Sequence, residues 1–125
     1  MTTSNHRSLQ DSTSRVPSSS GDRDFEITFD VPGLSSSTFV HTRPYLSYRV
    51  APVGSSGTRL VMELNGTEIV DLSYNTTVNR TMTEIFDHGV LRAGTGGVNT
   101  LRVFVPDDEP GSAQISELIV TYTDA

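Results

Sequence analysis

The residue types best suited to chemistry in this sequence are glycines ahead of an apolar run, scattered histidines, an acidic run and a few tyrosines with polar neighbours. A first hypothesis is that Gly94, Gly96 and Gly97 form a phosphate-binding loop. Such a loop requires a helix after the glycines, because the N–H groups of the helix N-terminus hold the phosphate. The segment that follows, VNTLRVFV, is β-branched and alternating. We therefore predict that these glycines turn the chain between two strands.

The sequence carries no catalytic constellation. His6, His41 and His88 are far apart, and none of the histidine spacings typical of zinc sites occurs. No serine stands in a G-x-S-x-G context, so the sequence encodes no nucleophile elbow. Cysteine is absent, which excludes thiolate nucleophiles, thiolate metal sites and disulfides. We predict that the protein is not an enzyme.

An acidic run, Asp107, Asp108 and Glu109, lies in a segment bracketed by two prolines. Adjacent carboxylates repel one another and are more stable when they are solvated. A flexible acidic loop can also hold calcium, which takes several oxygen ligands. We expect solvated charge and no cofactor, and a structural calcium ion is the less favoured alternative.

The overall charge argues against two classes of partner. The chain of 125 residues has 15 acidic and nine basic residues, and its formal net charge is −6. Proteins that bind nucleic acid concentrate positive charge on one face, and anionic membranes attract basic segments. No apolar stretch approaches the roughly 20 residues of a membrane span, and no signal peptide is apparent. We expect neither nucleic acid nor membrane insertion, with the cytoplasm as the default location.

The first 22 residues differ in composition from the rest. They contain seven serines and almost no large apolar side chains. A segment that can bury so little surface does not offset the entropy lost on ordering. We predict a flexible, disordered tail over residues 1–22 and one folded domain over residues 23–125.

Alternation of apolar and polar residues dominates the folded part, which is typical of half-buried strands. Residues 59–74 predict a hairpin whose turn, Asn65-Gly66, requires positive φ angles. Further strands are predicted from alternating apolar side chains over residues 24–30, 45–50, 99–105 and 115–123, and residues 38–43 are a shorter candidate. Residues 83–95 are predicted to form a strand and a short connector, with Ile85 and Phe86 as its apolar anchors. Residues 75–82 are predicted to form a polar loop. Seven or eight short strands with turns between them indicate an all-β, antiparallel jelly roll or β-sandwich.

Three segments resemble a known architecture: RLVMELNGTEI, FDHGVLRAGTGGVNTLRVFV and ISELIVTY. They are similar to the galactose-binding-domain-like jelly roll, and the second half of the chain resembles the C-terminal domain of rhamnogalacturonan lyases. The likeness covers residues 57–123. It implies a lectin-like carbohydrate-binding module without catalytic activity.

A sugar site needs an aromatic ring that stacks on the pyranose and polar groups that bind its hydroxyls. Tyr48 and Tyr122 fall on inward faces of their strands, whereas Tyr45 and Tyr74 lie at strand ends. The predicted carbohydrate-binding set, on one rim of the sandwich, is His41, Arg43, Tyr45, Tyr74, Asn75 and Arg80. A different class of function stays open, in which the sandwich is an assembly module that docks onto a protein partner or self-associates.

Overall fold

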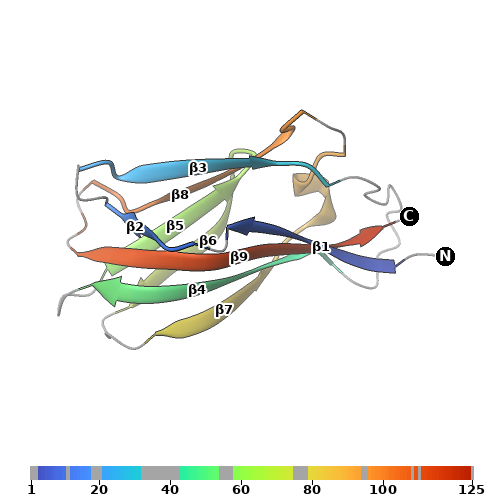
Figure 1. The fold of residues 1–125 in the computed structure, drawn as a ribbon. Helices are drawn as coiled ribbons and strands as arrows, with labels where there is room; N and C mark the ends of the chain where they lie inside the picture. The colour runs from blue at the N-terminus through green and yellow to red at the C-terminus, as the bar shows by residue number, and fades with distance from the viewer. Residues whose placement is uncertain are drawn as a thin grey trace.

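The structure, a computed structural model, describes residues 3–10, 12–17, 21–31, 43–53, 58–74, 79–93, 96–107, 109 and 111–124. These residues form two antiparallel sheets that pack face to face (Figure 1). The elements are β1 (Thr3–Gln10), β2 (Ser14–Val16), β3 (Asp24–Phe29), β4 (Tyr45–Val53), β5 (Thr58–Leu64), β6 (Thr67–Tyr74), β7 (Arg80–Ile85), the short 3₁₀ helix η1 (His88–Val90), β8 (Asn99–Phe104) and β9 (Ser112–Asp124).

The strand order is that of a jelly roll. The five-stranded sheet has the order β1-β9-β4-β7, with β2 also paired to β9, and the four-stranded sheet has the order β3-β8-β5-β6. If β1 and β2 are taken as one interrupted edge strand, eight strands form two interleaved four-stranded sheets. The predicted all-β, antiparallel sandwich is confirmed, with nine strands in place of seven or eight.

The core lies between the two sheets and follows the predicted alternation. Leu60, Met62 and Leu64 of β5 are fully buried, and Leu101 and Val103 of β8 meet them from the neighbouring strand. On the five-stranded sheet, the buried side chains of β4 and β9 include Leu46, Tyr48, Val50, Leu118, Val120 and Tyr122. Alternating burial directs the other side chains of these strands to the two outer faces of the sandwich.

The hairpin turn is confirmed and is tied to a buried polar network. Asn65 and Gly66 have φ angles of 52° and 82°. The Asn65 side chain donates to the carbonyl of Val90 at 2.7 Å and to Oδ1 of Asn99 at 2.9 Å. Asn99 is fully buried, and its side chain accepts from the N–H of Arg92 and donates to the Arg92 carbonyl, both at 2.8 Å. The two asparagines therefore join the hairpin to the segment that precedes β8.

Gly96 and Gly97 turn the chain between strands, as predicted, and Gly94 lies outside the described residues. Gly96 and Gly97 have positive φ angles and are followed by β8, not by a helix. Their N–H groups point at the carboxylate of Asp30, with N–O distances of 3.3 and 2.8 Å. The protein itself supplies the anion for these donors, which leaves no cradle for a phosphate there.

The N-terminal segment departs from the expected flexible tail wherever it is described. β1 pairs with β9 from Thr3 to Gln10, and β2 pairs with β9 from Ser14 to Val16. Val16 is buried in the core. Composition is a poor guide here, because an edge strand is held by backbone hydrogen bonds and needs few apolar side chains of its own. The predicted boundary between residues 22 and 23 remains an expectation.

Two further expectations change. Residues 80–82, predicted as loop, belong to β7, and Ile85, predicted with Phe86 as an apolar anchor, is 65% exposed while Phe86 is buried. β7 is the last strand of its sheet, so its outward side chains have little cover. The predicted strand over residues 38–43 lies outside the described residues, apart from Arg43. Within the described part of the chain, no helix has the length and apolarity needed to cross a membrane.

Candidate functional site

The structure does not gather the predicted site residues on one rim. Tyr45 begins β4, where it pairs with Ile85 of β7, whereas Arg80 pairs with Val50 further along the same ladder. Five residues of a strand span about 17 Å, so Tyr45 and Arg80 lie at opposite ends of the β4–β7 pair.

Tyr74 shares the end of the sandwich where Arg80 lies. It ends β6 and pairs with Thr58 at the start of β5, and six positions separate it from Arg80 along the chain. Arg43 is exposed just before β4, at the end where Tyr45 lies. His41 and Asn75 lie outside the described residues. The set therefore divides into two groups, and carbohydrate binding by its members remains a prediction.

The outer face of the four-stranded sheet carries charges that are already paired. Arg59 of β5 makes a bidentate contact with Asp71 of β6, with both N–O distances 2.8 Å. This hydrogen-bonded pair lowers the pKa of Asp71 and raises the pKa of Arg59. Exposed pairs of this kind order side chains but contribute little to stability.

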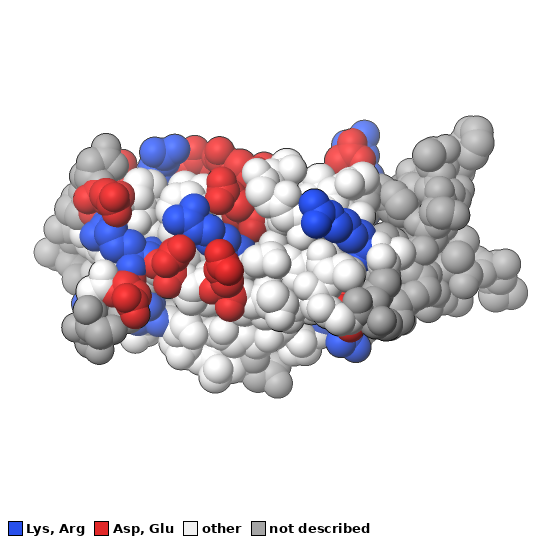
Figure 2. Space-filling model, turned by 90° about the horizontal axis from the view of Figure 1, so that it is seen from above, with Lys and Arg blue, Asp and Glu red and all other residues white. Residues whose placement is uncertain are grey.

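A second arginine on that face holds two carboxylates and a ring. Arg102 of β8 donates to Asp24 at 2.9 Å and to Glu63 at 3.2 Å, and its guanidinium lies 4.1 Å from the centre of the Phe104 ring. The hydrogen bond with Asp24 is the main cause of its raised pKa. Seen from above, acidic and basic side chains are interspersed and form no broad patch of one sign (Figure 2).

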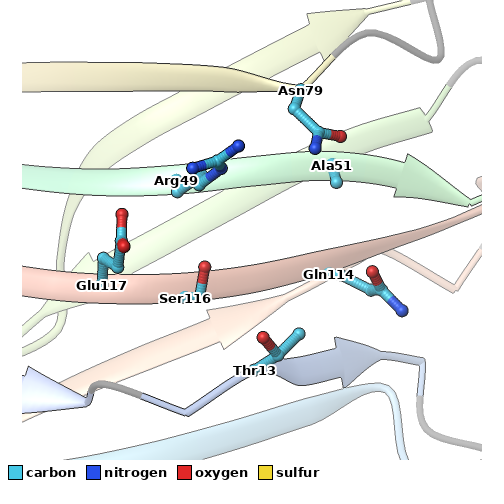
Figure 3. A pocket seen from close by; sticks show the side chains of 7 residues that line it. All are labelled: Thr13, Arg49, Ala51, Asn79, Gln114, Ser116 and Glu117. Carbon is cyan, nitrogen blue, oxygen red and sulfur yellow. The ribbon is translucent and has the colours of Figure 1, made fainter.

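The outer face of the five-stranded sheet carries a hollow of about 310 Å³. It lies over β4 and β9, and Thr13 borders it from the segment between β1 and β2 (Figure 3). The remaining lining residues are Arg49, Ala51, Asn79, Gln114, Ser116 and Glu117. Almost all of these side chains are polar, and amide, guanidinium, hydroxyl and carboxylate groups face one space. Together they can donate to and accept from a ligand rich in hydroxyls.

The two charged groups of the hollow are not engaged by the rest of the described protein. Arg49 pairs with Ser116 in the β4–β9 ladder, which sets it beside Glu117. Both side chains are exposed, and neither forms an ion pair with a described residue. This differs from Arg59 and Arg102, whose donors are occupied. Arg49 and Glu117 are therefore available to an external ligand.

An aromatic and an aliphatic side chain lie on the same face as the hollow. Tyr45, Ser47 and Arg49 alternate with the buried residues of β4, so all three point outward. Tyr45 is 37% exposed and Ile85, its partner on β7, is 65% exposed. Tyr45 and Arg49 are about 13 Å apart along the strand. The face thus offers a ring at one end and hydrogen-bonding groups at the other.

Most residues of this hollow were not predicted from the sequence, although signals for some of them exist. Tyr45, Ser47 and Arg49 occupy the outward positions of one alternating strand, so their common face could have been predicted. In β9 the buried positions run Ile115, Leu118, Val120, with a spacing of three and then two. A single spacing of three inside a period of two indicates a bulge. The contributions of Thr13 and Asn79 depend on tertiary structure and leave no local signal.

Metal binding finds no support in the described residues. No group of three or more His, Asp or Glu side chains with the geometry of a metal site occurs among them. In the acidic loop, Asp107 pairs with Arg23 at 3.2 Å, and Arg23 also donates to the carbonyls of Val105, Pro106 and Glu109. Asp108 lies outside the described residues. These contacts hold the described part of the loop against the start of β3.

No protein-family model and no curated protein matches the sequence. Among solved structures, the chain is similar to the carbohydrate-binding module CBM36 in complex with calcium and xylotriose, with 8% identity, 99% coverage of both chains and a TM-score of 0.45. It is also similar to the Arthrobacter globiformis T6 isomalto-dextranase complexed with panose, with 16% identity and a TM-score of 0.43. That match covers 90% of this chain but 17% of the other. Both TM-scores are below 0.5, so nothing about function is inferred from them.

Proposed function

We propose that this protein is a carbohydrate-binding module without catalytic activity, and that it binds sugar on the outer face of the five-stranded sheet. The observation that carries the proposal is the polar hollow with its unengaged Arg49 and Glu117, on the same sheet face as the exposed ring of Tyr45, about 13 Å away along β4. Sugar recognition requires these two components, a ring for the apolar side of a pyranose and planar polar groups for its hydroxyls.

The composition of the hollow favours binding over hydrolysis. Among the described residues, its lining contains one carboxylate, that of Glu117. Glycoside hydrolysis ordinarily uses two carboxylates on opposite sides of the scissile bond, one as acid and one as base or nucleophile. The hollow is also broad and open to solvent, whereas catalysis gains from excluding water. A single exposed carboxylate among amides and a guanidinium is suited to holding hydroxyl groups.

The test is affinity electrophoresis of the full chain through gels that contain a neutral polysaccharide, with dextran, galactan, xylan and mannan tried separately. The proposal predicts that at least one polymer retards the protein and that Tyr45→Ala and Arg49→Ala each abolish the retardation. Each contact contributes about 1 kcal/mol, so the affinity for a short sugar is weak. Retardation of the parent by none of these polymers would argue against the proposal, as would reducing sugar released on incubation.

The assembly function is the second candidate, and the edge strand β7 favours it. In an antiparallel pairing of two β7 strands centred on Met82, Arg80 of each copy faces Glu84 of the other, and Thr81 faces Thr83. A two-fold contact requires such self-complementarity. Arg80→Glu and Glu84→Arg each remove the charge match, and a mixture of the two variants restores it. Analytical ultracentrifugation tests this candidate: it predicts association for the parent and the mixture, and monomers for each variant alone.

A further inference from the structure

Glu117 occupies a backbone conformation that its residue type does not favour. Its φ angle is 55°, in the left-handed region where non-glycine residues are uncommon. Glycine, asparagine and aspartate are the residues that usually occur there, and glutamate is not among them. The Glu117 side chain is exposed and forms no ion pair with a described residue, so packing does not account for a glutamate here.

A β-bulge in β9 produces this conformation. Ser47 of β4 pairs with Ile119 and Arg49 pairs with Ser116, so two steps along β4 correspond to three steps along β9. The extra residue lies between Ser116 and Ile119, at Glu117 and Leu118, and Leu118 is buried in the core. Bulges of this type change the direction of a side chain and are frequent at functional sites. Here the bulge presents the Glu117 carboxylate beside Arg49.

The neighbouring edge of the sheet is interrupted at the same place. Gln10 of β1 pairs with Leu118, and Ser14 of β2 pairs with Ile115. Among the described residues, neither Ser116 nor Glu117 therefore pairs with β1 or β2. The Gln10 side chain spans the interruption and donates to the Ser12 carbonyl at 2.9 Å and to Ser14 Oγ at 3.0 Å. The bulge and the interruption together open the hollow on this side (Figure 3).

We infer that Glu117 and Arg49 act as a pair that binds adjacent hydroxyl groups of a neutral sugar chain and excludes acidic sugars. This inference rests on the proposed function. A carboxylate accepts hydrogen bonds from two O–H groups, and a guanidinium donates to hydroxyl oxygens. Charge-assisted hydrogen bonds of this kind are stronger than hydrogen bonds between two neutral groups.

The ligand is neutral because a carboxylate, that of Glu117, lies beside the Arg49 guanidinium. A uronate or a sulfated sugar pairs well with arginine alone, but Glu117 stands beside Arg49 and repels an anion. The net charge of −6 adds a repulsion at longer range. Glu117 is therefore the specificity-determining residue of the pair.

The experiment compares the parent with Glu117→Gly, Glu117→Gln and the control Glu26→Gln, whose carboxylate lies exposed on the other sheet. Retardation is measured in gels with the neutral polysaccharide that retards the parent and in gels with polygalacturonate. Glycine is free of strain at positive φ, so Glu117→Gly is expected to raise the thermal unfolding midpoint while weakening neutral-sugar binding about tenfold. Glu117→Gln keeps the shape of the side chain and is expected to increase retardation by polygalacturonate. Glu26→Gln is expected to leave retardation by both polymers unchanged.

Two outcomes overturn the inference in distinguishable ways. If the parent binds a neutral polymer through Arg49 but Glu117→Gly binds it equally well, the inference is wrong and the proposed function stands. If the parent is retarded by none of the polymers, the proposed function falls and the inference falls with it.

Discussion

The two outer faces of the sandwich carry the same kinds of charged residue, but among the described residues the arginines are paired with carboxylates on one face and unpaired on the other. On the four-stranded sheet, Arg59 and Arg102 are held by Asp71, Asp24 and Glu63. Val61 points outward there and is still only 4% exposed, opposite Phe104 in the ladder. On the five-stranded sheet, Arg49 and Glu117 lie side by side without an ion pair to any described residue, and Tyr45 and Ile85 are exposed.

This difference shows that residue type alone does not identify a binding face. A guanidinium whose donors are occupied by cross-strand carboxylates has little left for a ligand, and releasing it costs the contacts it already makes. An unengaged guanidinium loses only its hydration when a ligand binds. The face whose arginine is unengaged is for this reason the better candidate site.

The largest expected effect is the loss of the interrupted edge strand. Deletion of residues 1–17 removes the pairing of β1 and β2 with β9, uncovers the core around Val16 and takes Thr13 from the hollow. We expect a loss of about 3 kcal/mol or more in the free energy of unfolding, measured by urea titration, since one buried valine already contributes about 1.5 kcal/mol or more. Arg7→Ala, at an exposed position of β1, is the control. Unchanged stability of the deletion variant would mean that the segment is the flexible tail that its composition predicts.

A smaller loss is expected from the buried polar network. Asn99→Ala leaves one N–H of the Asn65 amide and both backbone groups of Arg92 without their partner. Unsatisfied buried polar groups cost about 1–3 kcal/mol, and urea unfolding should show a loss of that size. Asn79→Ala is the matched control, because Asn79 is exposed in the hollow. A loss of stability in the control that equals the loss in Asn99→Ala would show that burial does not explain the effect.

Most of the core could be predicted from the sequence, because alternation is a local property. The inward positions of β5 and β8, the inward Leu118, Val120 and Tyr122 of β9 and the turn at Asn65 were predicted from spacing alone. The site could not be predicted in the same way. Its side chains come from segments up to about 100 positions apart, and whether Arg49 is free or Arg102 is paired depends on cross-strand register. Strand β1 was missed because backbone pairing, not apolar composition, holds an edge strand.

The smallest expected effect is on the loss of folding stability as the pH falls. The hydrogen bond from Arg59 lowers the pKa of Asp71 below its ordinary value of about 3.9. A carboxyl whose pKa is lower in the folded state stabilises the fold above its unfolded pKa, and this contribution is lost as the pH falls through the folded pKa. Asp71→Asn should therefore lose slightly less stability than the parent between about pH 5 and pH 2. Equal losses in both proteins would show that the pair makes no measurable contribution.

The contrast between the two faces is tested most directly by one matched pair of variants, Arg49→Ala and Arg102→Ala, each measured for retardation by the polysaccharide and for its thermal midpoint. Arg49→Ala is predicted to lose retardation and to keep its midpoint, because Arg49 makes no ion pair with a described residue. Arg102→Ala is predicted to keep retardation and to lower the thermal midpoint by a few degrees. The substitution breaks two exposed ion pairs and one ring contact, which together contribute about 1 kcal/mol. The opposite pattern, with binding lost in Arg102→Ala and retained in Arg49→Ala, would contradict the account.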